Sequence, residues 1–321
     1  MRPVFLVSAA LALESGNGAP EDLNRLRRMD RFGRTGFLAG MRAFSGSGAS
    51  RPQGTDPRGG VIVGTRHGCR PAITEHATLL SAATRVEDLA PSVFASTVHN
   101  SVNGELALAL GLGGVSETII SGRSAGLEAL ILGARRVATD AADRVLVVAA
   151  EGVDDAMREA WTEERSLLGP RAAGVELVET GAAVLLEAEK MEDRDHIRFV
   201  EGCLFFEPDA RQARARFFEW MKEVEARAGE DARPAAVSLC VPDYEDFLEG
   251  EEGGGGDPSR IERLERFGAA GLYEIASDVA ARRALATDAL STHSPSKKIH
   301  VYVTRDVAGA VAAVALEVFS F

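Results

Sequence analysis

The segment from residue 121 to about residue 139 restricts the possible folds of this chain more than any other. Its opening run, Ser-Gly-Arg-Ser-Ala-Gly at 121–126, begins a predicted helix that follows a short strand. The early turns of this helix are almost wholly small or apolar: Ala125, Gly126, Leu127, Ala129, Leu130, Ile131, Gly133 and Ala134. A helix without a polar face is buried between layers of other secondary structure. The fold must therefore enclose a helix in its interior.

Predicted strands and helices alternate around this buried helix. The strands are short apolar runs at residues 4–11, 60–65, 117–120, 144–151, 181–187 and 197–206. Residues 23–44 carry apolar side chains three to five positions apart, which is typical of one helix lying on the surface of a sheet. Alternation of this kind favours a largely parallel sheet with helices on its faces.

The second part of the chain repeats this plan in shorter form. A long amphipathic helix at 209–228 precedes a strand at 235–240, and an alanine-rich helix at 268–286 precedes two strands at 299–304 and 311–319. The runs that close the two parts, at 181–187 and 309–317, resemble each other weakly. These features indicate an internal duplication, with one half at 1–207 and an abbreviated half at 208–321 that pack as one compact unit.

The charge of the chain argues against nucleic-acid and membrane partners. It has 36 Lys and Arg residues against 48 Asp and Glu, a formal net charge of -12 at pH 7. Such a surface repels nucleic-acid phosphates and anionic lipids. No apolar run approaches the roughly 20 residues that a membrane-spanning helix needs. We therefore expect a cytoplasmic protein.

Neither the cysteines nor the histidines suggest a metal site. The three cysteines, Cys69, Cys203 and Cys240, are widely spaced and include no Cys-x-x-Cys pair, which is typical of reduced thiols. The six histidines show no His-x-His or His-Glu-x-x-His spacing. We therefore expect no metal and no other cofactor.

Several segments, taken in order, resemble the β-ketoacyl synthases of the thiolase superfamily over nearly the whole chain. They are Leu-Arg-Arg-Met-Asp-Arg-Phe at 26–32, Val-Ile-Val-Gly-Thr at 61–65, Asp-Arg-Val-Leu-Val-Val-Ala-Ala-Glu at 143–151 and Thr-Gly-Ala-Ala-Val-Leu-Leu-Glu at 180–187. Residues 91–101, followed by Gly104, resemble ketosynthase-like proteins of bacterial polyene and related polyketide clusters. The resemblance implies a thiolase-like α/β fold, with two similar βαβαβ-type halves in a five-layer αβαβα arrangement.

The resemblance also implies where catalytic residues should stand. These enzymes use a cysteine thiolate at the start of the buried helix, whose N-terminus lowers the thiol pKa, and two histidines that decarboxylate the malonyl extender. In this chain Arg123 takes the cysteine position, Cys240 the first histidine position and Glu265 the second. An arginine cannot form an acyl thioester. We therefore expect a pseudoenzyme with no catalytic residue of the family's type, and a carboxylate such as Glu265 beside Arg123.

A degenerate member of this family implies a partner subunit. Thiolase-fold subunits associate through the strand before the buried helix, so the resemblance implies a homo- or heterodimer. In this chain the corresponding strand consists of Glu117, Thr118, Ile119 and Ile120. In polyketide systems an active β-ketoacyl synthase pairs with an inactive chain-length factor, which shapes the tunnel for the growing acyl chain. An acidic acyl carrier protein would dock near the shared entrance, with Arg27, Arg28, Arg31, Arg66 and Arg70 as candidate contacts.

Two other functions stay open. One is an active acyltransferase or hydrolase with a relocated nucleophile, for which the candidates are Ser121, Ser124, Cys240 and Cys69. A serine would need a base, and His99 is the histidine expected nearest to the site. His99 and Asn100, which with the two serines could line the site, could instead cap backbone groups at a strand end. The other function is that of a stand-alone regulator or acyl-group sensor.

Overall fold

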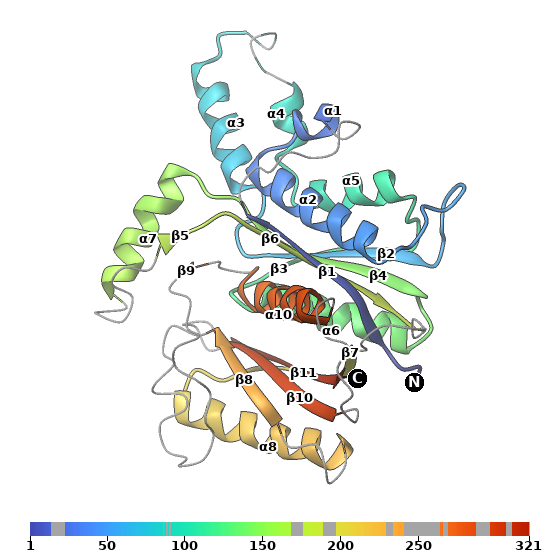
Figure 1. Ribbon diagram of the computed structural model, residues 1–321. Helices are drawn as coiled ribbons and strands as arrows, with labels where there is room; N and C mark the ends of the chain where they lie inside the picture. Colours follow the sequence, from blue (N-terminus) through green and yellow to red (C-terminus); the bar gives the residue numbers. More distant parts are fainter. Residues whose placement is uncertain are drawn as a thin grey trace.

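The computed structural model describes residues 1–13, 23–85, 87, 89, 91–167, 176–188, 197–228, 234–240, 264–265, 269–286, 296–305 and 310–320. These residues form five layers in the order helix, sheet, helix, sheet, helix, stacked from top to bottom in Figure 1. The expected thiolase-like α/β architecture is thereby confirmed.

The first half of the fold contains five strands in the order β3-β2-β4-β6-β1. Their bounds are β1 Phe5–Leu13, β2 Gly59–Thr65, β3 Ser116–Ile120, β4 Arg144–Glu151 and β6 Thr180–Glu187. Strands β3, β2 and β4 pair in parallel, whereas β6 runs antiparallel to both β4 and β1. The carboxyl ends of the three parallel strands therefore meet at one edge of the sheet, the edge where open α/β sheets bind their ligands.

The second half repeats this order with four strands, β8-β10-β11-β7. Their bounds are β7 Ile197–Phe206, β8 Pro234–Cys240, β10 Ser296–Arg305 and β11 Ala310–Ser320. Strands β8 and β10 pair in parallel, as β2 and β4 do, and β11 runs antiparallel to β10 and β7. Among the described residues, no strand stands beside β8 as β3 stands beside β2. The matching order and directions support an internal duplication with an abbreviated second half.

The two sheets are continuous, because β1 pairs antiparallel with β7, over Phe5 with Arg198 and Leu6 with Ile197, so that all nine strands are hydrogen-bonded in one series. In the order of strands, β7 takes the place in the second half that β1 takes in the first. By strand order, residues 197–206 belong with the second half, whereas the expected division between residues 207 and 208 assigns them to the first. That division stays a prediction.

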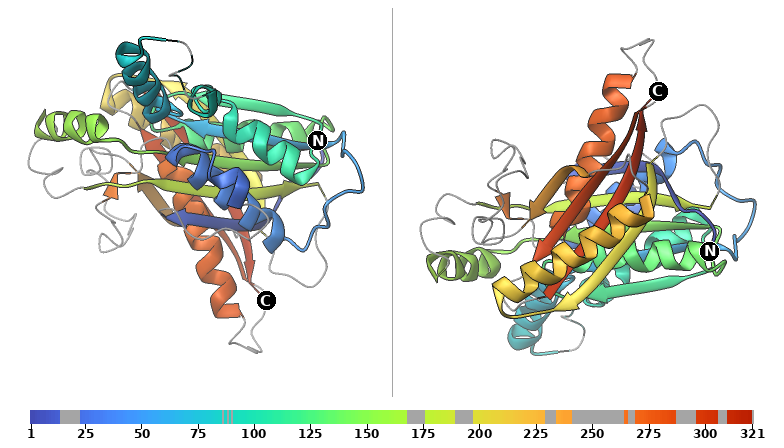
Figure 2. Two further views of the ribbon diagram at one scale, coloured as in Figure 1. Left: turned by 90° about the horizontal axis from the view of Figure 1, so that it is seen from above. Right: turned by 90° about the horizontal axis from the view of Figure 1, so that it is seen from below.

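Helices fill the layer between the sheets and cover both outer faces. The middle layer holds α6 (Ala125–Ala138) and α10 (Ala270–Ala286). The outer face of the first sheet is covered by α2 (Arg31–Gly46) and α5 (Ser101–Leu110), and that of the second sheet by α8 (Ala210–Ala228), as Figures 1 and 2 show. The helix predicted to be enclosed because it lacks a polar face is α6, and its enclosure is confirmed.

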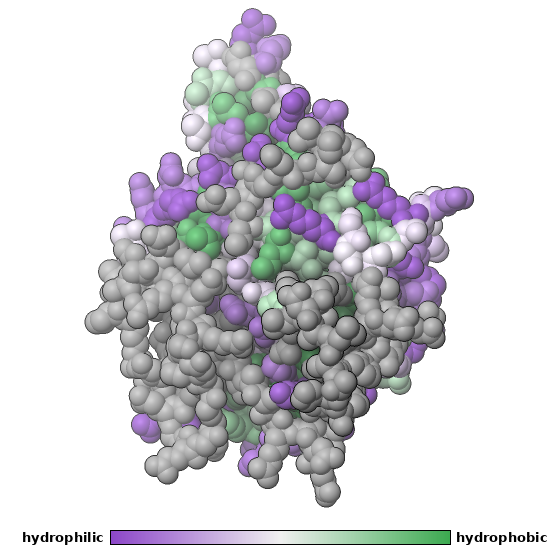
Figure 3. Space-filling model, viewed as in Figure 1, coloured by the Kyte–Doolittle hydropathy of each residue, from purple (hydrophilic) through white to green (hydrophobic). Residues whose placement is uncertain are grey.

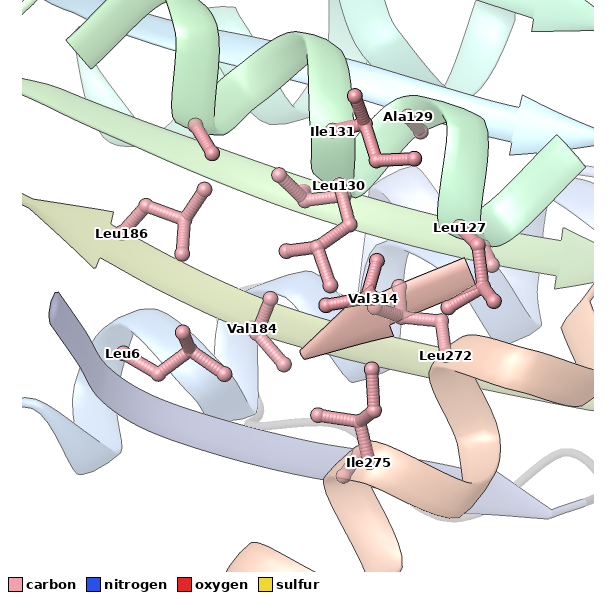
Figure 4. Packing of buried hydrophobic residues seen from close by; sticks show 14 of the residues in the cluster. Leu6, Leu127, Ala129, Leu130, Ile131, Val184, Leu186, Leu272, Ile275 and Val314 are labelled. Carbon is pink, nitrogen blue, oxygen red and sulfur yellow. The ribbon is translucent and has the colours of Figure 1, made fainter. Parts of the chain in front are cut away.

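The middle layer is the main hydrophobic core. Leu127 and Leu130 of α6 are fully buried and pack in one cluster with Val184 of β6 and Ile275 of α10 (Figure 4). Each fully buried leucine contributes about 1.5–3 kcal/mol to stability. The approach of α6 to the first sheet requires a glycine, because a Cβ at Gly64 of β2 would lie 2.3 Å from the carbonyl oxygen of Ala125.

The single helix predicted for residues 23–44 was wrong. A short helix α1 (Leu23–Leu26) ends first, and α2 begins after Asp30, whose carboxylate accepts a hydrogen bond from the backbone N–H of Gly33 (2.7 Å). This is the usual N-cap contact, which satisfies a backbone donor that the helix leaves free. The apolar spacing continues through the break, so periodicity alone did not reveal it.

The strand-end position expected for His99 and Asn100 was also wrong. Both residues lie in a turn between α4 (Pro91–Ala95) and α5, and Asn100 precedes α5 without a side-chain cap hydrogen bond. Helix α4 belongs, with α3 (Arg70–Ala82), to a part of the chain that projects beyond the first sheet at the top of Figure 1.

Three further elements complete the described structure. Helix α7 (Asp155–Leu167) follows β4, and two short strands, β5 (Glu176–Leu177) and β9 (Leu264–Glu265), pair in parallel. No helix within the described ranges is both long and apolar enough to cross a membrane.

Candidate functional site

The connection between β3 and α6 places Arg123 at the carboxyl edge of the first sheet. The backbone N–H of Ser121 donates to the carbonyl oxygen of Thr65 at the end of β2 (3.2 Å), which holds this connection against the sheet. Only 2% of the surface of Arg123 is exposed, and Ser124 beside it is also buried. Arg123 therefore lies inside the protein, immediately before the interior helix.

The guanidinium group of Arg123 lies over the ring of Trp161 on α7, with 6.0 Å between Cζ and the ring centroid. Trp161 packs with Val153, Met157 and Leu177 in a small buried cluster. A cation is attracted to the electron-rich face of an indole ring. This contact offsets part of the unfavourable placement of a cation at a helix N-terminus. Trp161 was not singled out from the sequence, where its signal is a large apolar residue in a helix in which six of 13 residues are charged.

The carboxylate expected beside Arg123 belongs to Glu265, whose side chain lies outside the described residues. Its backbone is described, because β9 pairs with β5 and sets Glu265 opposite Leu177. Leu177 packs in the cluster that contains Trp161. The backbone of Glu265 thus runs beside the elements that hold Trp161, and an ion pair between Arg123 and Glu265 stays a prediction.

Both serines of this connection are hydrogen-bonded to one carboxylate. The hydroxyls of Ser121 and Ser124 donate to Oε1 of Glu128 at 2.8 and 2.5 Å. Glu128 lies in the first turn of α6, where the helix dipole stabilises a negative charge. His99 makes its contact elsewhere, with Nδ1 at 3.5 Å from Sγ of Cys69. In the described structure, no hydrogen bond joins His99 to either serine.

The second half contributes Cys240 and Thr304 to the same region. Cys240 ends β8 opposite Thr304 of β10, and its side chain lies outside the described residues. Thr304 is fully buried. A Cβ on Gly271, in the first turn of α10, would lie 2.9 Å from Cγ2 of Thr304 and 2.6 Å from Cγ of Leu127 in α6. The end of β10 and the first turns of both interior helices therefore converge between the sheets.

A buried carboxylate holds the loop after β2. Glu151, at the end of β4, accepts hydrogen bonds from the hydroxyl of Thr65 (3.1 Å) and from the backbone N–H groups of Arg66 and His67. The loop leads to Cys69, which precedes α3 and is fully buried. Burial, with a smaller contribution from the charge of Asp30, raises the pKa of the Cys69 thiol to about 11. Cys69 is therefore protonated at neutral pH and is a poor nucleophile.

A cavity of about 440 Å³ lies where the start of α2, α3, α4 and the start of α7 meet. Its charged lining residues are Arg27, Arg28, Asp30, Arg31, Arg34, Glu75, Asp154 and Asp155. Burial raises the pKa of Asp30 to about 6, against smaller opposing effects of the Gly33 N–H and Arg34. Of the five arginines expected to meet a carrier protein, the cavity is lined by three, and Arg66 and Arg70 stand outside its lining.

The strand expected at a subunit interface, β3, is the outermost strand of the first sheet. None of its residues is buried, and Ile120 is 50% exposed. The carboxylate of Glu117 accepts hydrogen bonds from Nε and Nη2 of Arg136 at 3.0 and 2.6 Å. Figure 3 shows apolar side chains gathered on the projecting part of the molecule, where the exposed large apolar residues are Ile73, Leu80, Phe94 and Val98.

Within the described part of the chain, no group of three or more His, Cys, Asp or Glu side chains is arranged to hold a metal ion. The arrangement at the start of α6 supplies a buried cation on an aromatic ring and two hydroxyls bonded to a carboxylate. It therefore offers charge and hydrogen bonds, and neither a thiolate nor an imidazole lies among the contacts described at this helix start.

Many solved structures share this fold, among them the following three. The ishigamide ketosynthase/chain length factor superposes with a TM-score of 0.76 at 18% identity, over 99% of each chain. A type II polyketide synthase acyl carrier protein in complex with its ketosynthase bound to the hexaketide (AntDE:AntF) gives 0.71 at 18% identity, over 98% of this chain and 99% of that one. A β-ketoacyl synthase from Burkholderia phymatum gives 0.71 at 14% identity, over 99% and 100%. At these identities the likeness establishes the fold.

The sequence itself identifies the family. No curated protein sequence matches the chain. The profile described as "Beta-ketoacyl synthase, N-terminal domain" matches residues 21–190, which is more than half of the chain. The matched segment contains every strand of the first sheet except β1, together with the interior helix α6 and the connection that carries Arg123. The chain belongs to the β-ketoacyl synthase family.

Proposed function

We propose that this protein is a catalytically inactive ketosynthase-like subunit that pairs with an active β-ketoacyl synthase, as a chain-length factor does, in carrier-protein-dependent polyketide, polyene or fatty-acid-like biosynthesis. The observation that carries the proposal is Arg123, buried at the start of α6. A guanidinium group stays protonated in proteins and offers no nucleophile for a thioester. The side chains of Arg123 and Trp161 also take up space at the start of α6.

The other two positions implied by the family resemblance agree with this proposal. Cys240 and Glu265 stand where histidines are expected, and neither side chain can act as a neutral imidazole does. An inactive subunit needs a partner that carries the chemistry. Its own contribution would be to stabilise the partner's fold and to form part of the wall of the acyl-chain tunnel.

The proposed partner joins at the outer edge of β3, over residues 117–120. A specific subunit interface buries more than about 1,000 Å² of surface in total. The carrier protein of such a system is acidic, and Arg27, Arg28 and Arg31 at the 440 Å³ cavity offer it a basic contact. Docking that depends on these charges weakens as salt concentration rises.

A second candidate function is an acyltransferase or hydrolase with a serine nucleophile. It is favoured by the hydrogen bonds from Ser121 and Ser124 to Glu128, because a carboxylate can orient a hydroxyl. A serine nucleophile also needs a group that takes its proton, usually a histidine. His99 is in contact with Cys69 instead, so we rank this function second.

The test combines acylation with association. The purified chain is incubated with acyl-CoA or acyl-loaded carrier protein, alone and with an intact ketosynthase from the same gene cluster, and intact masses are measured. We expect an acyl adduct on the ketosynthase and none on this chain, and sedimentation should detect a complex. An adduct mapped to Ser121, Ser124 or Cys240 would favour the second candidate. A monomeric chain that binds no ketosynthase would overturn the proposal.

A further inference from the structure

The edge strand β3 is held by its parallel pairing with β2 and by partly buried Ile119, and it contributes little further apolar surface to the core. Its sequence, Ser-Glu-Thr-Ile-Ile at 116–120, includes three polar residues, and none of the five is buried. Only β2 pairs with it among the described strands. Burial of apolar surface is the dominant favourable contribution to packing. Side-chain contacts from neighbouring elements therefore matter more for β3 than for a strand buried in the core.

Asn103 of α5 supplies these contacts from the outer face of the sheet. Its side-chain amide donates to the carbonyl oxygen of Val61 in β2 (2.9 Å) and to that of Glu117 in β3 (2.7 Å). Its Oδ1 accepts a hydrogen bond from the hydroxyl of Ser116 (2.5 Å). Asn103 is 1% exposed, so these bonds are shielded from water. One side chain thus joins α5 to two neighbouring strands and satisfies both amide protons.

The second side-chain contact on β3 is the ion pair between Arg136 and Glu117, which is weaker because solvent reaches it. Arg136 holds the carboxylate of Glu117 from the side of α6, but the two side chains are 41% and 31% exposed. Solvent screens an ion pair of this kind, and such pairs contribute little on average. The buried amide of Asn103, bonded to backbone as well as to Ser116, is therefore the stronger of these two side-chain restraints on the start of β3.

We infer that Asn103 is a positioning residue for subunit association, which holds β3 against β2 so that its outer edge is ready to receive a strand of a second ketosynthase-fold subunit. The inference rests on the proposed pairing through β3. An edge strand recruits a partner through its unpaired backbone groups, and a strand held in one place loses less entropy when the partner binds. Because β3 leads directly to Ser121 and Arg123, the same restraint also fixes the connection to α6.

The experiment compares Asn103→Leu with Thr35→Val. Leucine keeps the branched shape of the asparagine side chain, although it is larger, and removes all three hydrogen bonds. Thr35 is the control because it is equally buried, on α2 over the same sheet, and its hydroxyl bonds only to carbonyls of its own helix. Hydrogen exchange is measured at residues 116–120, and sedimentation gives the dissociation constant of the homodimer or of the complex with the ketosynthase.

For Asn103→Leu we expect exchange in β3 to rise about tenfold or more, and the dissociation constant to rise by a similar factor. Thr35→Val should change both quantities by less than about threefold. Adding Ser116→Ala to Asn103→Leu should have little further effect, because the bond it removes is already lost.

The outcomes separate this inference from the proposed function. A wild-type chain that neither self-associates nor binds a ketosynthase overturns the proposed function. A wild-type complex whose dissociation constant is unchanged by Asn103→Leu overturns the inference alone. Faster exchange in β3 with unchanged association also overturns it, because Asn103 would then serve only the stability of the sheet.

Discussion

The guanidinium carbon of Arg123 lies 6.0 Å from the centroid of the Trp161 ring, and both side chains are almost fully buried. Arg123 follows β3 and Trp161 lies on the helix that follows β4. Strands β3 and β4 both run parallel to β2, so the segments after them leave the same edge of the sheet. The contact is therefore a consequence of the topology, and it places a cation at the start of α6.

This contact should appear as a coupling energy between the two side chains. We expect the double-mutant cycle of Arg123→Met and Trp161→Leu, measured by urea unfolding, to give about 1–2 kcal/mol, as for a desolvated cation and ring. The control cycle uses Arg214 and Phe218 on α8, which are 5.5 Å apart and partly exposed, and should give less than about 1 kcal/mol. A coupling near zero for the first cycle would mean that other groups hold Arg123.

Two glycines should respond to alanine in opposite directions. Gly64→Ala places a Cβ 2.3 Å from the carbonyl oxygen of Ala125, so it should displace α6 and destabilise the protein by about 3 kcal/mol or more. Gly104 lies within α5, where an added Cβ would meet no atom within 4 Å, and alanine there should stabilise the helix by up to about 1 kcal/mol. Thermal unfolding checks both. Destabilisation by Gly104→Ala would indicate that another subunit packs on this face of α5.

Most elements of the fold were predictable because their signals are local, whereas the five-layer arrangement followed from the family resemblance. The run of small and apolar residues after residue 124 indicates an enclosed helix by itself, and short apolar runs mark the nine strands of the main sheet near their observed positions, whereas the short strands β5 and β9 were not predicted. The break at Asp30 had a local signal too, an aspartate able to cap a new helix. It was missed because Met29 and Phe32 continue the apolar spacing across the break.

The contacts of the site were less predictable, because they join residues that are distant in sequence. Trp161 stands 38 positions after Arg123, in a helix in which six of 13 residues are charged, and nothing local relates the two. Asn103 bonds to backbone 42 residues before it and 14 residues after it, and its role depends on which strands become neighbours. Patterns of residue type predict elements, whereas such contacts follow only from strand order.

The described cysteines should be nearly inert in the native protein. Burial raises the pKa of Cys69 to about 11 and that of Cys203 to about 12, so little thiolate exists at pH 8. In a Cys240→Ser variant, we expect iodoacetamide to react at least about 100-fold more slowly with native than with urea-unfolded protein, where the thiol pKa is near 8.5. Peptide mapping by mass spectrometry gives the rate at each site. Rapid native labelling of Cys69 would instead indicate a thiolate stabilised by His99 and would favour an active enzyme.

Asp30 should make stability depend on pH in an unusual direction. Burial is the main cause that raises its pKa in the folded state to about 6, from 3.8 in the unfolded chain. The folded state therefore binds the proton more tightly than the unfolded state. The resulting stabilisation is complete below pH 3.8 and is lost as the pH rises through 6. The difference between the two pKa values corresponds to about 2–3 kcal/mol.

The variant Asp30→Asn isolates this effect. Asparagine keeps an oxygen that can accept the hydrogen bond from the Gly33 N–H but does not titrate. Between pH 4 and pH 7, we expect the unfolding free energy of the wild type, relative to the variant, to fall by about 2–3 kcal/mol. Denaturant unfolding at pH 4, 5, 6 and 7 measures this difference. The contributions of all other titrating groups to the unfolding free energy are common to both proteins and cancel. A difference that stays constant over this range would mean that Asp30 is ionised in the folded state down to its ordinary pKa, and that water or a bound cation at the 440 Å³ cavity solvates its carboxylate.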